Sequence, residues 1–277
     1  MATAHDTGVT WYDVAPAYGD GRAEGLLGEF LRGKRDTVVI CTKVGLAPPK
    51  VSSPKKVVRA LARPVIKAFP QLRARVAGLR GENVRMPITA ATIEASVANS
   101  LRQLKTDYID ILALHDPAPE DVTNAEVLAA LTRLVEKGDV RVLSVAGDLA
   151  AIHAAAPSRI FTLAQTRDTI FAPALSTLPP LPGRFLISHG AFGSGTLERA
   201  SSLLAAQPAA RDHLMTLVPG AGSVGDLLMS YALAANAAGV VLASMFRPDH
   251  IRANCAHAST APNPALVAEM RRLIGAG

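Results

Sequence analysis

Four polar side chains with complementary chemistry follow three short apolar segments of this 277-residue chain. Asp13 and Tyr18 follow the first segment, Lys43 ends the second and His115 ends the third. Tyrosine is a poor acid at neutral pH because its ordinary pKa is about 10. A lysine ammonium nearby favours the phenolate, and an aspartate beside the lysine holds it charged and in place. With a histidine to orient a carbonyl oxygen, the set describes a general acid that protonates a carbonyl while hydride reaches its carbon.

These side chains converge only if the apolar segments are neighbouring parallel strands. Seven segments of the strand type, apolar on both faces, occupy residues 10–15, 37–43, 108–115, 140–146, 160–165, 185–188 and 239–243. Helical patterns lie between them at residues 22–32, 91–104, 125–137, 149–155, 195–206, 223–237, 248–257 and 264–274. Uninterrupted alternation predicts an α/β fold in which residues 1–277 form a single (β/α)8 TIM-type barrel domain.

The strand count is one short of a closed barrel. The chain begins with the helical pattern of residues 2–7, which leads directly into the first strand. We therefore expect a barrel that lacks its first strand–helix unit, either because the true start lies upstream or because the barrel is incomplete. An open edge strand would be an aggregation hazard unless something covers it.

Residues 46–88 interrupt the alternation and carry the charge excess. This stretch contains six prolines and ten basic residues against one acid, Glu82, so its net charge is +9. Because the whole chain has a net charge of +6, the remaining residues carry −3. It is interpreted as a basic insertion on a βα loop, the side that carries function in such barrels. Because it follows Lys43, it should overhang the mouth, where it steers an anion inward or forms an ordinary solvated surface.

Composition excludes several classes of protein. Hydrophobic residues make up 49% of the chain, which rules out disorder. Two cysteines give no disulfide framework, and no Cys/His spacing predicts a metal site. Neither a signal peptide nor a membrane span is expected, so the predicted location is cytoplasmic. A nucleic-acid or anionic-surface binder would explain the charge, but the basic insertion offers Phe69 as its single aromatic residue, so no such partner is expected.

Several motifs in a fixed order resemble the aldo-keto reductase family. They are Asp-Val-Ala-Pro-Ala-Tyr-Gly at 13–19, Ala-Glu-Gly-Leu-Leu-Gly at 23–28, Thr-Lys-Val-Gly at 42–45, Ile-Glu-Ala-Ser through Ser-Leu-Arg-Gln-Leu at 93–104, Asp-Tyr-Ile-Asp at 107–110 and Leu-His at 114–115. The match runs to about residue 145. It is looser afterwards, at 192–195 and 247–254.

The resemblance implies reversible hydride transfer between a nicotinamide and a small aldehyde, ketone or alcohol, with a sugar-derived aldehyde among the options. NADP(H) is expected more than NAD(H), and the oligomeric state is left open. Tyr18 would be the acid/base, Lys43 and Asp13 its tuning pair, and His115 the group that orients the carbonyl. Cofactor contacts would involve Asp13, Gln165, His189, Arg247, His250 and Asn254.

Two positions depart from the family pattern on the cofactor side. Ala146 and Gly147 stand where the family has a Ser-Asn pair that holds the nicotinamide carboxamide. His189 stands where an aromatic ring stacks on the nicotinamide. These changes leave the acid/base set intact and weaken the case for ordinary cofactor binding. An alternative is therefore a degenerate binding or regulatory protein with weak or no turnover. Consumption of NADPH in the presence of a reactive aldehyde separates the two hypotheses.

Overall fold

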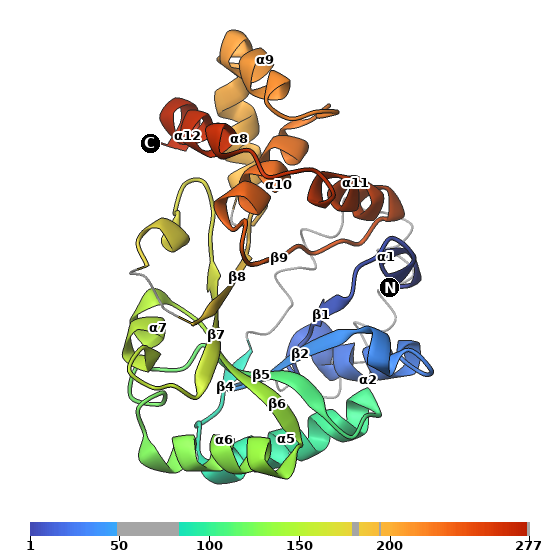
Figure 1. Ribbon diagram of the computed structural model, residues 1–277, viewed down its shortest axis with the longest axis vertical. Helices are drawn as coiled ribbons and strands as arrows, with labels where there is room; N and C mark the ends of the chain where they lie inside the picture. The colour runs from blue at the N-terminus through green and yellow to red at the C-terminus, as the bar shows by residue number, and fades with distance from the viewer. Residues whose placement is uncertain (49–82, 179–182, 194, 276–277) are drawn as a thin grey trace, which may run out of the picture.

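Seven parallel strands form a strongly curled sheet in a computed structural model that describes residues 1–48, 83–178, 183–193 and 195–275 (Figure 1). In spatial order they are β1 (Trp11–Asp13), β2 (Val39–Val44), β5 (Ile109–His115), β6 (Val140–Ala146), β7 (Phe161–Arg167), β8 (Phe185–His189) and β9 (Val240–Leu242). The seven predicted strands are thus confirmed, and their spatial order equals their order along the chain. The sheet is a nearly closed barrel of the TIM type.

The two outer strands, β1 and β9, face each other across the opening of the sheet (Figure 1). Within the described residues, each pairs with one neighbour only, β2 and β8 respectively. Both are three residues long and only partly buried, whereas β2, β5, β6 and β7 are mostly buried. The sheet is therefore most deeply buried in its middle strands and open between its two outer strands.

Helices cover the outer face of the sheet because each presents one apolar stripe to it. They are α2 (Ala23–Phe30), α5 (Ala90–Leu104), α6 (Ala125–Lys137) and α7 (Leu149–Ala155). Thr89 and Thr92 form a capping box at the start of α5, and Gly138 ends α6 with φ of 85°. Buried side chains such as Ile93, Val97 and Leu131 then fill the layer between helices and strands.

The barrel interior has its own small core of Cys41, Ile111, Ala113, Ala146, Leu163 and Ile187, with Trp11 and Leu242 packed against it. These are the alternate residues of each strand, which point inward with a period of two. Cys41 is fully buried, as expected for a packing residue.

A second tier of helices follows β8. It contains α8 (Thr196–Ala205), α9 (Pro208–Thr216), α10 (Val224–Ala235) and α12 (Pro264–Met270), which share one apolar cluster around the buried Tyr231. The sequence patterns missed α9. The remaining C-terminal helix, α11 (Pro248–Ala258), lies beside the N-terminal α1 (Ala2–Asp6) (Figure 1), and the Thr7 Oγ1 is 3.4 Å from the Cys255 Sγ.

The predicted insertion is described only at its two ends, where β3 (Leu46–Ala47) pairs antiparallel with β4 (Val84–Arg85). Arg85 donates a hydrogen bond of 2.5 Å to the carbonyl oxygen of Asp116, so the base of the insertion adjoins the end of β5. Nine of its ten basic residues, from Lys50 to Arg80, lie outside the described residues. Of the helices that are described, none is long and apolar enough to cross a membrane.

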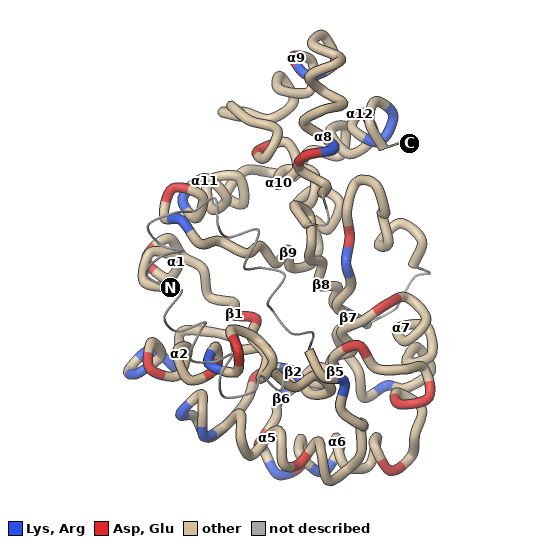
Figure 2. Tube along the Cα trace, turned by 180° about the vertical axis from the view of Figure 1, so that it is seen from behind, with Lys and Arg blue, Asp and Glu red and all other residues tan. Residues whose placement is uncertain are grey.

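Charged residues of the described chain gather on the outer helices and loops, where both signs alternate along α5 and α6, while the strands of the sheet are mostly uncharged (Figure 2). The charged groups that do lie on strands therefore stand out. Lys43 is buried at the end of β2, and Arg167 ends β7.

Candidate active site

A cavity of about 1820 Å³ opens at the carboxyl ends of the strands. Its wall includes Asp13, Tyr18, Lys43 and His115, together with Gln165, Arg167, His189, Phe192 and Asn254. In parallel barrels this end carries the active site because the βα loops converge there. The cavity brings together all four side chains that the sequence proposed for acid–base chemistry.

Strand alternation and close backbone contact position these four groups. Lys43 is the second residue after Cys41 and pairs in register with Ala113, so it points into the barrel. Gly45 follows β2 with φ of 130°, and a β-carbon there would lie 2.6 Å from the carbonyl oxygen of His115. A side chain at position 45 would therefore separate the ends of β2 and β5.

A buried ion pair joins β1 to β2. The Lys43 ammonium binds the Asp13 carboxylate and lies 3.3 Å from the carbonyl oxygen of Val14. The side chain of Lys43 is only 1% exposed. Burial alone would lower the pKa of Lys43, but the neighbouring Asp13 carboxylate raises it above its usual value. The lysine is therefore held as a cation inside the site.

Tyr18 begins a short turn of 3-10 helix (Tyr18–Gly21) that follows the buried segment after β1. The Lys43 ammonium is 4.9 Å from the centre of its ring, and the His115 ring meets it edge-on at 5.8 Å. Burial raises the pKa of Tyr18 above its usual value, and the charge of Lys43 lowers it by less. The expected effect of Lys43 on the phenol is present, but desolvation outweighs it, so Tyr18 keeps its proton at neutral pH.

His115 is an uncharged imidazole. Burial, followed by the charges of Lys43 and His189, lowers the pKa of His115 to about 3. Its Nδ1 is buried and has no hydrogen-bond partner within the described protein. A neutral imidazole offers one N–H donor and one acceptor, which suits it to hold a carbonyl oxygen.

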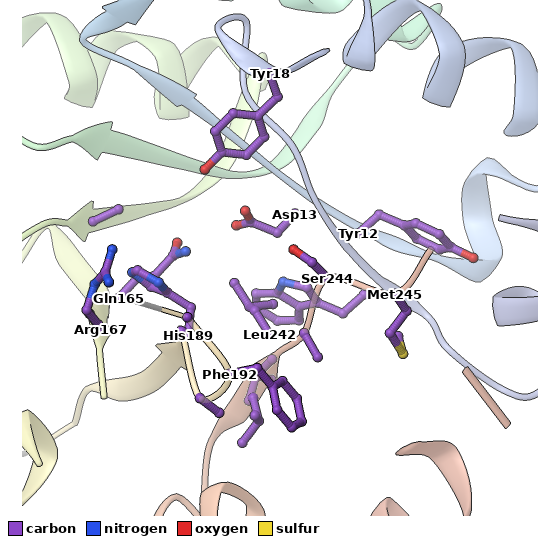
Figure 3. Close-up of a pocket in the computed structure, with 18 of the residues that line it drawn as sticks. Tyr12, Asp13, Tyr18, Gln165, Arg167, His189, Phe192, Leu242, Ser244 and Met245 are labelled. Atoms are coloured by element: carbon purple, nitrogen blue, oxygen red, sulfur yellow. The ribbon is translucent and has the colours of Figure 1, made fainter. Parts of the chain in front are cut away.

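The opposite side of the cavity comes from β7 and β8. Gln165, Arg167 and His189 gather there, and the Tyr18 hydroxyl points toward the space between them and Asp13 (Figure 3). Arg167 pairs in register with His189. Burial and then the Arg167 charge lower the pKa of His189, so this ring is also uncharged at neutral pH. The sequence interpretation missed Arg167 because it ended the strand at Gln165.

The C-terminal segment contributes only part of the predicted set. Asn254 and Ser244 line the cavity. Arg247 and His250 are exposed on the first turn of α11 and are not among the cavity-lining residues, and Arg247 pairs with Asp249 at 2.6 Å. Their assignment to the cofactor stays a prediction.

Several buried polar atoms around the cavity lack a partner in the described protein. They are Trp11 Nε1, Tyr12 OH, Asp13 Oδ2, His115 Nδ1 and Gln165 Oε1. Buried polar groups normally find partners, so this cluster indicates that a polar ligand supplies them. A nicotinamide cofactor carries both donors and acceptors, so the residues present fit it. In the described part of the chain, no three His, Cys, Asp or Glu side chains are grouped to hold a metal.

Known proteins match the chain in both sequence and structure. The sequence model of the aldo/keto reductase family matches residues 1–159. D-threo-aldose 1-dehydrogenase from a Pseudomonas species is 32% identical over 157 residues, which are 52% of this chain and 42% of the relative. The chain spans less than half the length of the first curated relatives it matches.

Two solved structures share the fold. An aldo-keto reductase from Bacillus halodurans in its holo form has a TM-score of 0.73 at 20% identity, covering 100% of this chain and 86% of that one. An aldo-keto reductase from Klebsiella pneumoniae in complex with NADP and acetate has a TM-score of 0.68 at 20% identity, covering 99% and 83%. At 20% sequence identity, these similarities establish the barrel fold and do not by themselves establish the activity.

Proposed function

We propose that this chain, which belongs to the aldo/keto reductase family, is an NAD(P)H-dependent oxidoreductase that interconverts a small aldehyde or ketone and its alcohol. The observation that carries this proposal is the contact of Tyr18 with both Lys43 and His115 at the mouth of the barrel. A phenol, a buried cation and a neutral imidazole around one cavity are the groups that a carbonyl reduction needs.

Each residue has a separate task in the reduction. When bound, the nicotinamide supplies the hydride to the carbonyl carbon. The Tyr18 hydroxyl gives its proton to the carbonyl oxygen, and the neutral His115 donates a hydrogen bond to the same oxygen. The Lys43 ammonium stabilises the phenolate that Tyr18 becomes, while Asp13 keeps the lysine charged and in place. Because Tyr18 is protonated at neutral pH, the free site is prepared for reduction.

The cofactor and substrate classes are part of the proposal. NADP(H) is preferred to NAD(H), since the Klebsiella relative was solved with NADP. A hydroxylated aldehyde of the sugar type is a reasonable substrate class, because one sequence relative is named an aldose dehydrogenase. The cavity suits such a compound, since Asp13, Gln165 and the two imidazoles line it.

The site also supports a second candidate, a binding protein without turnover. Ala146 and Gly147 lie at the cavity and provide no side-chain hydrogen bond, and His189 stands where the family resemblance implies an aromatic ring stacked on the nicotinamide. A protein of this kind would bind NADPH and leave it unoxidised.

One assay with two tyrosine variants tests the proposal. The purified protein should oxidise NADPH, followed by absorbance, when a reactive aldehyde is added. Tyr18→Phe should lower kcat by about 10²- to 10⁴-fold, the usual contribution of a general acid, with little change in NADPH affinity. Tyr108→Phe is the matched control, because Tyr108 directly precedes β5, at the opposite end of that strand from His115, and is not among the residues that line the cavity.

The outcomes separate the two candidates. Binding of NADPH without its oxidation would support the binding protein. Equal activity in wild type and Tyr18→Phe would refute the assignment of Tyr18 as the acid.

A further inference from the structure

A serine, a histidine and an aspartate are hydrogen-bonded in sequence in the C-terminal helices. Ser230 and Asp226 are four residues apart on α10, so they lie on the same face of that helix, and His257 comes from the last turn of α11. The His257 Nε2 is 3.2 Å from the Asp226 Oδ1, and the His257 Nδ1 is 3.4 Å from the Ser230 Oγ. The imidazole therefore bridges the other two side chains through both of its ring nitrogens.

The carboxylate of Asp226 is held in place by hydrogen bonds of its own. Its Oδ2 accepts from the backbone N–H groups of Gly222 and Ser223, at 3.0 and 2.9 Å, and from the Ser223 hydroxyl at 2.9 Å. Burial would raise the pKa of Asp226, but these bonds and the contact with His257 outweigh burial and lower the pKa below its usual value. Asp226 is therefore an ionised acceptor at neutral pH, and its Oδ1 faces His257.

The aspartate determines which ring nitrogen of His257 carries the proton. An ionised carboxylate only accepts hydrogen bonds, so the Nε2 that faces it must be the N–H donor. In the neutral ring the Nδ1 is then an acceptor, and the Ser230 hydroxyl must donate to it. A serine that donates to a histidine, which a third group orients, is the arrangement of an activated nucleophile. The 3.4 Å separation of the Ser230 Oγ and the His257 Nδ1 is typical of such pairs before a substrate binds.

The nucleophile is accessible, whereas its base is shielded. Ser230 is half-buried, and His257 is only 8% exposed. Both line a small cavity of about 20 Å³ that shares only Leu233 with the main cavity. The apolar residues around it include Leu217, Val218, Pro219, Ala261, Pro262 and Leu266. A cavity of this volume holds about one water molecule, so it admits a methyl group and excludes a longer chain.

The other polar side chains of this small cavity are already engaged. The Thr260 Oγ1 donates to the carbonyl oxygen of His257, and the Asn263 Nδ2 donates to the carbonyl oxygen of Leu217. Neither is therefore available to stabilise the oxyanion of an acyl transfer, and one missing donor costs about 10²- to 10³-fold in rate. The cluster is suited to accept an acyl group from an activated donor and unsuited to cleave an ordinary ester or amide.

We infer that Ser230 is an acyl-accepting site, activated by His257 and Asp226, which takes an acetyl-sized group from an activated ester or thioester. The Ser230 Oγ bonds to the carbonyl carbon while its proton passes to the His257 Nδ1. The bond between that carbon and the leaving oxygen or sulfur then breaks, and the proton leaves with that atom. The products are an ester of Ser230 and a free alcohol or thiol, with no oxidation or reduction. This site is separate from the proposed reductase chemistry, so either can fail without the other.

The test uses p-nitrophenyl acetate as the acyl donor and locates the acetyl group on the full chain by peptide mapping. A mildly alkaline pH keeps imidazoles uncharged. Wild type should carry an acetyl group on Ser230 that neutral hydroxylamine removes, because hydroxylamine cleaves esters and leaves lysine amides intact. The exposed Ser202 on α8 should stay unlabelled. p-Nitrophenyl butyrate should label Ser230 about tenfold more slowly or less, because its chain exceeds the small cavity.

Two variants test the base and the group that orients it. His257→Gln should slow acetylation of Ser230 by about 10²- to 10⁴-fold, the usual contribution of a general base. Asp226→Asn should also slow it, because an amide NH₂ that faces the Nε2 turns that nitrogen into the acceptor and puts the ring proton on Nδ1. His213→Gln is the matched control, since His213 is an exposed histidine on α9 that lies 3.6 Å from Glu269. Circular dichroism and Tm confirm that each variant is folded.

The outcomes separate an activated serine from a structural contact. An unlabelled Ser230 in wild type overturns the inference. Equal labelling in wild type and a folded His257→Gln also overturns it, because the histidine would then only tie α10 to α11. If His257→Gln does not fold, wild-type labelling of a folded Asp226→Asn has the same meaning. Equal rates with acetate and butyrate would show that the small cavity does not receive the acyl group.

Discussion

The two walls of the cavity are built differently. One wall carries the proposed acid–base residues Asp13, Tyr18, Lys43 and His115 and is called the catalytic wall for that proposal. Its members contact one another, through the Lys43–Asp13 ion pair, the Lys43 ammonium near the Tyr18 ring, and the edge-on contact of Tyr18 with His115. The protein itself assembles this geometry.

The recognition wall consists of Gln165, Arg167 and His189. These residues are positioned by the strands that carry them, β7 for Gln165 and Arg167 and β8 for His189. The buried Gln165 Oε1 has no partner within the described protein. This contrast teaches that changes on the catalytic wall should reduce both folding stability and kcat, because its contacts are internal. Changes on the recognition wall should reduce ligand affinity and leave the free protein folded. The predictions below test that division.

The largest expected effect follows removal of the buried cation. Lys43→Met leaves the largely buried Asp13 carboxylate without its partner, which usually costs about 3–5 kcal/mol of unfolding free energy. For a chain of this size, Tm should fall by roughly 10 °C, and kcat should fall with it. Gln165→Met, on the other wall, should shift Tm by no more than about 2 °C.

A double variant sharpens this result. Asp13→Asn together with Lys43→Met removes both charges, so Tm should recover by at least half while activity stays lost. A single Lys43→Met variant with wild-type Tm would show that the catalytic wall is not held by its ion pair. Differential scanning fluorimetry provides the measurement.

The pH–rate profile should reflect Tyr18 alone. Because burial raises the pKa of Tyr18 above its usual value of about 10 and His115 stays neutral above about pH 3, carbonyl reduction should be level from about pH 6 to 9. Above the pKa of Tyr18 the rate should fall tenfold per pH unit, since the acid has lost its proton. An inflection between pH 6 and 7 that disappears in His115→Asn would contradict a neutral His115.

Folding stability should weaken in acid because of the same histidine. The pKa of His115 is about 3 in the folded protein and about 6.5 when unfolded. Between these values the unfolded chain binds the additional proton, so the unfolding free energy falls as pH drops, by at most about 1.4 kcal/mol per pH unit. When the unfolding free energy is measured by urea titration at several pH values from 7 to 4, it should fall less steeply with decreasing pH in His115→Asn than in wild type. Equal pH dependence in the two proteins would mean that folding does not change the pKa of His115.

The smallest effect is expected from the basic insertion. Replacing Lys55, Lys56 and Arg59 by glutamine should raise KM for the cofactor or substrate by roughly two- to fivefold at low salt, if the insertion steers anions toward the mouth. The change should vanish near 0.5 M salt, where charges are screened within about 4 Å. These residues lie outside the described part of the structure, so this expectation rests on the sequence. A change that is independent of salt would exclude steering.

Strand positions were predictable because buried parallel strands are continuous apolar runs bounded by turns. The four groups of the catalytic wall were predictable for the same reason, since each lies near the carboxyl end of such a run or shortly after it. Arg167 was missed because the predicted strand ended at Gln165, although the two-residue alternation of Leu163, Gln165 and Arg167 could have placed it. Helix α9 was missed because Pro208 and a weakly amphipathic sequence concealed it.

The direction in which the pKa of Tyr18 is shifted could not be predicted from the sequence. Its sign depends on whether desolvation or the charge of Lys43 is larger, and only the three-dimensional burial of the ring decides that.

The sheet order has a consequence for how the protein is made. Each strand of the sheet pairs with the one before it in that sheet, so a nascent chain leaving the ribosome can add each new strand to a neighbour that already exists. Within the described residues, the first and last strands of the sheet, β1 and β9, do not pair with each other. Two helices far apart in the sequence, α1 and α11, contact each other late in synthesis, and that contact brings α11 to the rim of a cavity whose catalytic wall is already complete.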